Sequence, residues 1–249
     1  MPKVSINILT RNRAEFLRLA LDSVQRQQFT DWEIIVVNDA SSDHTAAVLA
    51  DFKTRGLPLI CLHHARQAGI TASRQEALTA SSGQYVAILD DDDEWTDPAK
   101  LQRQADYLDA HPKAVLVGGG MEVRNLQGHL SKYFRPTADR AIRRTMLWRN
   151  NFFTSTVVFR RAAALRAGGF LKDGPDLAED YDLWLRLGRA GEMYNFPDVF
   201  VNYRRSAYNK QRFGAFLRKQ LKLIGLYKAD YPGYLVAKIF LTLRSLILR

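Results

Sequence analysis

The chain has 249 residues, 47% of them hydrophobic, which excludes wholesale disorder and allows one large domain with a sizeable core. It has one cysteine, Cys61, no apolar core of the signal-peptide type and no apolar run near the roughly 18 residues of a spanning helix, so we expect a cytoplasmic protein without disulfides. The net charge of +10 favours a polyanionic partner, either an anionic membrane surface or a nucleic acid.

Short apolar runs alternate with helical patterns through the first half of the chain. Strands are predicted at Val4–Leu9, Glu33–Asn38, Leu59–Leu62, Tyr85–Leu89 and Val115–Gly119, and the fully apolar Glu33–Asn38 is typical of a strand buried in a parallel sheet. Apolar spacing and capping signals (Ser42, Asp43, Asp97 with Pro98) predict helices over 14–27, 46–52, 71–80 and 97–110. This β-α-β order predicts an α/β fold with a mainly parallel sheet flanked by helices.

The second half is less regular. Residues 150–170 combine a strand-like run with a helix and a Gly-Gly turn, and Ala178–Gly191 has the apolar spacing of a helix.

Polar residues follow three of the predicted strands. They are Thr10, Arg11 and Asn12 after the first, Asn38 and Asp39 after the second, and an acidic run after the fourth. Each group has a local explanation as turn or cap chemistry. Ligands of parallel α/β sheets bind beyond the carboxyl ends of the strands, so three polar groups at equivalent ends favour a ligand site.

The acidic run Asp90–Glu94 holds five consecutive carboxylates. In an extended chain Asp90 and Asp92 would share one side, and Asp91 and Asp93 the other. Such carboxylates can hold Mg²⁺ or Mn²⁺, with phosphate oxygens completing the shell. The alternative is a solvated acidic turn, and the position at a strand end favours the cation.

The segments "VSINILTRNR", "EIIVVNDASSDHT", "GITASRQEAL" and "AILDDDDEWTDPAKL", in that order, resemble the family 2 glycosyltransferases. The resemblance is close over about 3–105 and extends to "AEDYDLWLRL". It implies the GT-A fold, inverting chemistry, a UDP- or GDP-sugar donor and Mg²⁺ or Mn²⁺. It also implies a glycan or lipid-linked acceptor, as in bacterial polysaccharide and lipopolysaccharide synthesis. Nucleotide binding then falls to about 1–110, and the acceptor to about 111–202.

The resemblance also assigns roles to individual residues. The nucleotide contacts are Thr10, Arg11, Asn12, Asp39, Arg74, Asp90 and Asp91. Asp92 and Asp90 match the metal position, and Asp180 matches the general base, with an N-cap of the following helix as its alternative. The resemblance places four residues on the donor-sugar and acceptor side: Glu179, Thr154, Ser155 and Trp95. Trp95 either stacks on a sugar or packs in the core.

Several positions depart from the pattern of the family. Leu9 stands where the family commonly has a proline, and Arg11 stands where it has an aromatic residue. On either side of Asp39, Asn38 and Ala40 replace the usual Asp and Gly. "QAG" at 67–69 and Glu76 also differ. These departures concern recognition of the donor base more than the chemistry. His63 and His64 lack the spacing of metal ligands and are predicted to be structural.

The last part of the chain is a separate basic region. Residues 203–249 hold eleven Lys and Arg and one acidic residue, a net charge of +10. The net charge of residues 1–202 is therefore zero. From Tyr234 on, a helical face of Lys238, Thr242, Ser245 and Arg249 interrupts an apolar sequence. The segment is too short to cross a bilayer, and it predicts a helix lying on an anionic membrane. The alternatives are a helix docked on the domain and a dimer contact; nucleic-acid binding is not expected, because no RNA-binding motif is present.

The sequence therefore predicts an inverting, metal-dependent glycosyltransferase at the cytoplasmic face of a membrane, with its catalytic domain over 1–202. A nucleotidyltransferase would need a glycine-rich phosphate loop, which "ILTRNR" lacks. A non-catalytic nucleotide-sugar or membrane-binding module is the other alternative, and Asp92 and Asp180 argue against it.

Overall fold

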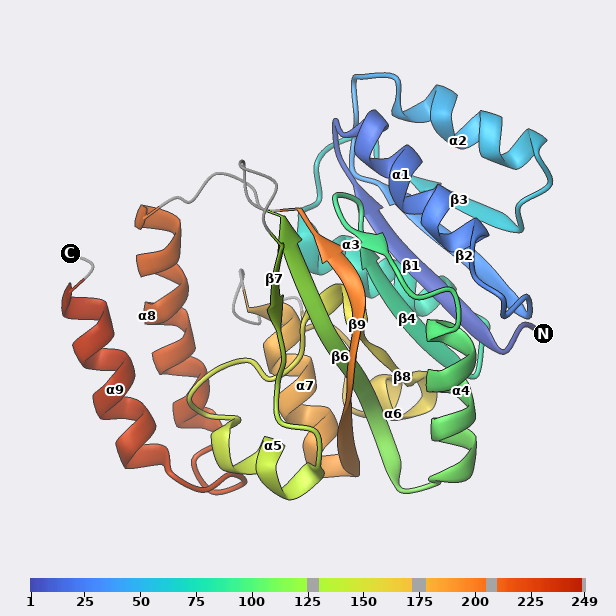
Figure 1. Ribbon diagram of the computed structural model, residues 1–249. Coiled ribbons are helices and arrows are strands. Elements are labelled where there is room, and N and C mark those ends of the chain that lie inside the picture. The colour runs from blue at the N-terminus through green and yellow to red at the C-terminus, as the bar shows by residue number, and fades with distance from the viewer. Residues whose placement is uncertain (125–129, 172–177, 205–209, 248–249) are drawn as a thin grey trace.

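The computed structural model describes residues 1–124, 130–171, 178–204 and 210–247 (Figure 1). Within them, nine strands form one sheet in the order β3-β2-β1-β4-β8-β6-β9-β5, with β7 paired to β6. The strands are β1 Val4–Thr10, β2 Trp32–Asn38, β3 Leu59–His63, β4 Tyr85–Asp90, β5 Glu94–Trp95, β6 Ala114–Arg124, β7 Leu130–Tyr133, β8 Val158–Arg160 and β9 Glu192–Tyr203.

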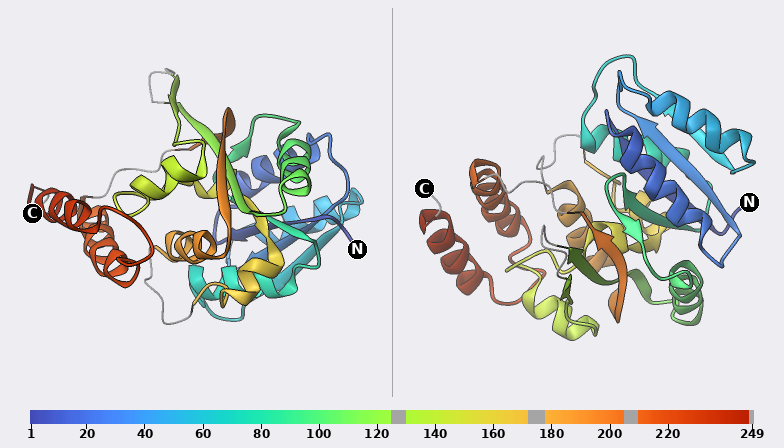
Figure 2. Two further views of the ribbon diagram at one scale, coloured as in Figure 1. Left: turned by 90° about the horizontal axis from the view of Figure 1, so that it is seen from below. Right: turned by 45° about the horizontal axis from the view of Figure 1, so that its top comes forward.

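Helices cover both faces of this sheet (Figure 2). They are α1 Ala14–Gln25, α2 Thr45–Thr54, α3 Ile70–Ala80, α4 Lys100–Ala110, α5 Asp139–Thr145, α6 Arg161–Arg166, α7 Glu179–Ala190, α8 Lys210–Leu226 and α9 Tyr234–Ile247, with a 3₁₀ turn, η1, at Thr154–Thr156. The predicted α/β fold is confirmed.

The four strands β1 to β4 are parallel, as their apolar runs predict. The register aligns Thr10 with Asn38, and Leu9 with Asp90, so the polar residues that follow these strands meet at one edge. Helix α4 begins later than predicted, at Lys100, because the Asp97 carboxylate accepts the backbone N–H of Ala99 in a turn before the helix.

The second half adds strands of both directions. Strand β8 is antiparallel to β4 and β6, and β9 is parallel to β6. Strand β9 was not predicted, because its sequence, which contains Pro197 and two asparagines, lacks an apolar run. The β6–β9 pair has register shifts around Gly118–Gly120, where a methyl group added at Gly119 would collide with the Phe200 ring.

The C-terminal helices share the core of the second half. Tyr227, Tyr231, Ala237 and Leu241 are buried in the same apolar cluster as Trp184 of α7. Helices α8 and α9 lie side by side at the end of the molecule away from β3 (Figures 1 and 2). In the described part of the chain, no helix has both the length and the apolarity to cross a bilayer. Arg205 and Arg249 of the basic region lie outside the described residues.

Gly119→Ala should lower the free energy of unfolding by about 1–3 kcal/mol, because the added methyl overpacks the contact with Phe200. Thermal and urea unfolding measure this change. Gly225→Ala is the matched control: in α8 its nearest neighbour would be 3.9 Å away, so a gain of up to about 1 kcal/mol is expected. Equal effects of the two substitutions would contradict the close approach of β6 and β9.

Candidate active site

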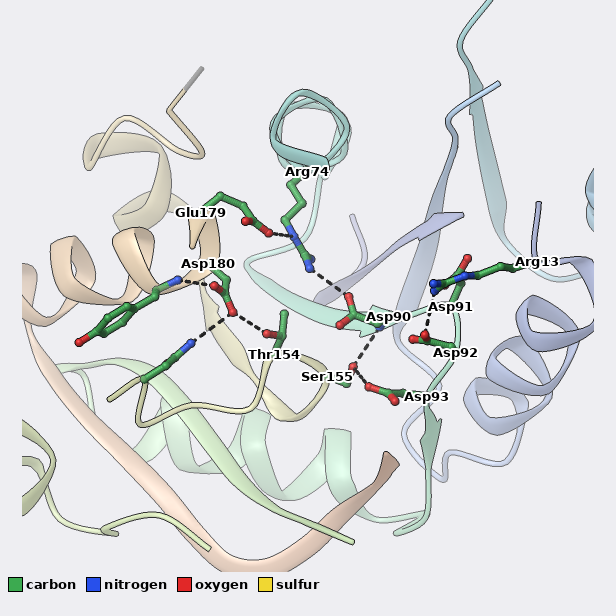
Figure 3. Close-up of polar contacts among 12 residues, drawn as sticks. Arg13, Arg74, Asp90, Asp91, Asp92, Asp93, Thr154, Ser155, Glu179 and Asp180 are labelled. Atoms are coloured by element: carbon green, nitrogen blue, oxygen red, sulfur yellow. Dashed lines mark hydrogen bonds and ion pairs between the residues drawn. The ribbon is translucent and has the colours of Figure 1, made fainter. Parts of the chain in front are cut away.

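The predicted strand-end residues meet at the carboxyl edge of the sheet (Figure 3). Arg13, just before α1, donates through Nη1 to Asp91 Oδ1 at 2.9 Å and to Asp92 Oδ2 at 2.8 Å. The expected alternation of the four aspartates is wrong. The chain turns after β4, where the Asp93 N–H binds the Asp90 carbonyl, so Asp91 and Asp92 share one cation.

A buried arginine joins the acidic run to helix α7. Arg74 of α3 is 5% exposed; its Nη2 donates to Asp90 Oδ1 at 3.0 Å and its Nε to Glu179 Oε1 at 3.1 Å. Burial alone would lower the pKa of this guanidinium, but the charges of Asp90, Glu179 and Asp180 raise it. Burial also raises the pKa of Glu179, together with the charge of Asp180. Arg74 therefore holds the end of β4 and the start of α7 together, and its predicted nucleotide contact stays a prediction.

Asp180 lies in the first turn of α7 with its carboxylate held from two sides. Its Oδ2 accepts the Thr154 hydroxyl at 2.6 Å and the Asn150 side-chain amide at 3.3 Å. The N-cap position of α7 belongs to Ala178, so the N-cap alternative for Asp180 is wrong. The carboxylate is thus oriented by neighbours from outside its own helix, as a positioned base requires.

Asp93 lies behind the edge rather than on it. Ser155 Oγ donates to Asp93 Oδ2 at 2.5 Å and accepts the Asp90 N–H at 3.1 Å. Burial, with the neighbouring charge of Asp90, raises the pKa of Asp93 to about 8. Ser155 is buried too, so it braces the acidic run from behind.

Trp95 packs in the core, so of the two alternatives for this residue core packing is the one the structure has, and stacking on a sugar is wrong. The side chain is 2% exposed, and its indole N–H donates to the Ser155 carbonyl at 2.8 Å. The Lys100 ammonium lies 4.1 Å from the centre of the indole ring, so no face of the ring is open to a ligand.

The Asp39 carboxylate is fixed by hydrogen bonds at the ends of β2 and β3. It accepts His64 Nδ1 at 2.7 Å and the backbone N–H groups of Ala68 (2.7 Å) and Gly69 (3.0 Å). Burial acts to raise the pKa of Asp39, and these hydrogen bonds outweigh it, so the pKa is lowered. The other ring nitrogen of His64 contacts Glu76, and both acidic neighbours raise the pKa of His64.

The first loop is tied to the second. Asn12 has a left-handed backbone (φ 53°), and its Oδ1 accepts the Ser42 N–H at 2.7 Å. Asp43 accepts the N–H of Ala14 at 3.0 Å and thereby caps α1 as well as its own turn. Thr10 is buried at the end of β1, whereas Arg11 is exposed at the rim.

The donor set at the edge fits a hard divalent cation with an incomplete protein shell. Among the described residues, no three His, Cys, Asp or Glu side chains converge as a full metal cage. Two carboxylate oxygens, from Asp91 and Asp92, nevertheless converge within 2.9 Å of one cationic nitrogen. Mg²⁺ sites in proteins commonly use one or two carboxylates, and water and phosphate oxygens supply the remaining ligands.

Comparison with known proteins identifies the family. Residues 5–169 match the family described as "Glycosyl transferase family 2". The chain belongs to this family. The matched segment contains the whole acidic run, Arg74 and the Asn150–Ser155 segment, whereas Asp180 lies beyond it.

Relatives of this family 2 chain extend the match. An uncharacterized protein of Mycobacterium bovis is 32% identical over 213 residues, which cover 82% of this chain and 59% of the relative; the chain thus spans less than two thirds of that protein. The amylovoran biosynthesis glycosyltransferase AmsE of Erwinia amylovora is 25% identical over 250 residues, 99% of this chain and 93% of AmsE.

A solved structure confirms the GT-A fold. The mannosyltransferase PcManGT of Pyrobaculum calidifontis, in complex with GDP-Man and Mn²⁺, superposes with a TM-score of 0.74 at 19% identity, over 99% of this chain and 72% of that one.

Sequence reasoning missed Arg13 at this edge. It placed Asn150 in the segment on the donor-sugar and acceptor side and predicted His64 to be structural, but it found the partners of neither. Arg13 stands beside the predicted loop residues, but nothing in "TRNR" shows which arginine turns toward the acids. Asn150 contacts Asp180 across 30 positions of sequence. His64 directly follows strand β3, so the strand-end rule that found Asp39 would have found it as well.

His64 should make the free energy of unfolding depend on pH above its ordinary pKa of 6.5. Its pKa is raised above 6.5, so its contribution is present below pH 6.5 and is lost as the pH rises through the folded-state value. Thermal unfolding between about pH 5.5 and 8.5 should therefore show a smaller fall with rising pH in His64→Gln than in the parent. His63→Gln, at an exposed neighbour, is the control. Parallel curves for parent and His64→Gln would contradict the predicted shift.

Proposed function

We propose that this chain transfers a sugar from a nucleotide-diphosphate donor to an acceptor hydroxyl with inversion at the anomeric carbon. The observation that carries the proposal is the row of side chains along the edge (Figure 3): Arg13 contacts Asp91 and Asp92, and Arg74 contacts Asp90 and Glu179. Asp180 directly follows Glu179. One end of this row is a cation-binding pair of carboxylates, and the other is an oriented carboxylate. The membership of family 2 supports the same chemistry.

Asp180 is the proposed general base. An acceptor hydroxyl is a weak nucleophile, so a carboxylate within hydrogen-bond reach must take its proton during attack on the anomeric carbon. Thr154 and Asn150 donate to Oδ2 of Asp180, and the Tyr181 N–H donates to Oδ1 at 2.6 Å, so both carboxylate oxygens are held in place. A single displacement from the side opposite the leaving nucleotide inverts the anomeric centre.

Asp92 and Asp90, with Asp91 beside them, would hold Mg²⁺ or Mn²⁺. When bound, such an ion offsets the charge that develops on the leaving diphosphate. Arg13 already supplies a positive charge to Asp91 and Asp92, and with a metal bound its charge would add to that of the ion in offsetting the diphosphate. The Mn²⁺ in the similar mannosyltransferase complex supports this assignment.

The donor side comprises the loops that follow β1 and β2, with Thr10, Arg11, Asn12 and Asp39. We propose a UDP- or GDP-sugar as the donor, and the GDP-Man of the similar mannosyltransferase supports it. AmsE, a glycosyltransferase of amylovoran biosynthesis, supports a polysaccharide or lipid-linked glycan as the acceptor. A nucleotidyltransferase would not need the Asp180 carboxylate, and a binding module would not need its orientation by Thr154 and Asn150.

Nucleotide release from a panel of UDP- and GDP-sugars with Mn²⁺, with and without EDTA, tests the reaction. Asp180→Asn should lower glycosyl transfer by roughly 10²–10⁴-fold and keep donor binding, since it removes only proton abstraction. Asp92→Asn should lose the Mn²⁺ dependence of nucleotide binding. Asp106→Asn, an exposed aspartate of α4, is the control. Full transfer by Asp180→Asn would place the base elsewhere, and no release with any donor would reject the function.

We also propose that the C-terminal helices hold the enzyme peripherally at the inner face of the membrane. Helix α9 packs on the domain through Ala237 and Leu241, which are buried. Its opposite side exposes an apolar strip, here called the outer arc, consisting of Leu235, Val236, Ile239, Phe240 and Leu243, each 45–71% exposed. The exposed Lys238 flanks this arc, and the basic residues of 203–249 complement an anionic lipid surface. The helix is thus docked and amphipathic at once.

Replacing Leu235 and Ile239 together by serine should lower binding to phosphatidylglycerol-containing vesicles by at least about tenfold, because each buried leucine-sized side chain contributes about 1.5–3 kcal/mol. Flotation of the full chain measures the bound fraction. Leu19→Ser, which removes an exposed leucine of α1, is the control. Unchanged flotation of the double variant would show that the outer arc does not meet the membrane.

A further inference from the structure

The C-terminal helices contact the helix of the proposed base through a buried tyrosine. Tyr227, directly after α8, is 4% exposed, and its hydroxyl donates to Asp182 Oδ1 at 2.6 Å. Asp182 is buried in the first turn of α7, the turn that also carries Asp180. The other oxygen of Asp182 accepts Nε and Nη2 of Arg186 at 2.9 and 2.7 Å. Tyr227 is therefore one of the partners of a buried carboxylate that stands two positions after the base.

The same helices hold the segment on the other side of the base. The side-chain amide of Gln220 in α8 donates to the Trp148 carbonyl at 3.2 Å, and Gln220 is 2% exposed, so this contact is buried. The Trp148 ring stacks against Phe240 of α9 with ring centres 6.2 Å apart. Two residues after Trp148, Asn150 donates to Asp180 Oδ2. The helix pair thus supports both the turn that carries the base and a segment that binds its carboxylate.

A further hydrogen bond joins these two supports to each other. The hydroxyl of Tyr181, the residue next to the base, donates to the Met146 carbonyl, two positions before Trp148. The first turn of α7, the segment after Met146 and the C-terminal helices therefore form one group of contacts around the base. The acidic run with Arg13 lies at the other end of the row, beyond Arg74 (Figure 3). These contacts thus bear on the base and leave the donor end of the site apart.

Buried polar contacts of this kind fix a position more than they add stability. A buried ion pair is often no more stabilising than apolar side chains of the same volume, because desolvation offsets the attraction. Asp182 is nevertheless held by Arg186 and Tyr227, and a fully hydrogen-bonded network of this sort specifies one arrangement of its members. A general base must lie about 2.6–3.2 Å from the group whose proton it takes, and a misplacement of about 1 Å can cost about 10²-fold in rate. The turn of α7 that carries Asp180 is where such a network matters most.

We propose that Tyr227 and Gln220 are positioning residues for the transfer, which hold the base Asp180 from its two sides. Tyr227 acts through Asp182 and the first turn of α7, and Gln220 acts through the backbone of Trp148 and the segment that follows it. This inference rests on the proposed role of Asp180 as the general base. It makes the C-terminal helices part of the catalytic unit: their inner side supports the base, while the outer arc stays on the opposite side of α9.

Tyr227→Phe and Tyr231→Phe form a matched pair for the test. Tyr231 is 3% exposed, and its hydroxyl donates at 2.7 Å to the carbonyl of Leu185, beyond the first turn of α7. Each substitution removes one buried hydrogen bond and should lower the midpoint of thermal unfolding by about 2–4 °C. With the donor that the panel of UDP- and GDP-sugars identifies, only Tyr227→Phe should lower kcat for nucleotide release, by about tenfold, at an unchanged donor KM. Gln220→Met, which keeps the volume and loses the N–H donor, should act as Tyr227→Phe does.

The side-chain amide of Asn150, which donates to Asp180, reports the position of the base without turnover. In ¹⁵N-labelled protein its resonances should shift in Tyr227→Phe and Gln220→Met and keep their parental positions in Tyr231→Phe. A parental kcat in Tyr227→Phe would overturn the proposal, and so would an equal fall in Tyr231→Phe, which would indicate a general loss of stability. If the parent releases no nucleotide from any donor, the amide shifts alone decide: shifts as expected support the positioning contacts while the transferase is rejected, and parental resonances reject both.

Discussion

The buried guanidinium of Arg74 is the interaction on which the arrangement of the site depends. A carboxylate at the end of β4 and another at the start of α7 could not approach each other in a dry interior without a cation between them. Arg74 binds both with its Nη2 and Nε atoms, so one side chain from α3 fixes the spacing of the two halves of the fold. Asp180, the proposed base, directly follows Glu179, so this contact also fixes its position.

The crowding of acids in the run after β4 is resolved by giving each aspartate a different neighbour. Arg74 pairs with Asp90, and Arg13 pairs with Asp91 and Asp92. Asp93 accepts a hydrogen bond from the Ser155 hydroxyl. Burial raises the pKa of Asp91 to about 6 even with Arg13 beside it, so compensation at this point is partial. A divalent cation bound there would compensate the charge of these carboxylates more fully than Arg13 does. This difference is the electrostatic basis for a metal site.

Local sequence patterns were sufficient for the first half of the fold and insufficient for the second. Strands β2 and β4 contain continuous apolar runs that are buried on both faces, and the shared direction of β1 to β4 places the ligand edge. Strand β9 has no such run, and it forms because β6 offers a partner 70 or more residues earlier. The burial of Trp95 likewise depends on Ser155, far along the chain.

The site residues likewise fall into those that a local pattern marks and those that depend on contacts distant in sequence. Asp39, the acidic run and Asp180 were predicted because strand ends and the family pattern mark them. The roles of Arg13 and Asn150, and the bracing function of Ser155, arise from contacts across 30 to 79 positions, which no local pattern encodes. Charge matching is the physical rule that sequence reading could not apply, because it requires knowing which opposite charges become neighbours.

The segment from Trp148 to Thr154 touches α8, α9 and the first turn of α7 within a few residues. Its length is therefore as constrained as its composition. One inserted residue would add up to about 3.5 Å of chain, which exceeds the tolerance of the hydrogen bonds that hold Asp180. Natural variation in loop length should accumulate elsewhere on the surface and avoid this stretch, so a gap-free alignment here, even among relatives of low identity, would be the evolutionary trace of a fixed distance between tail and base.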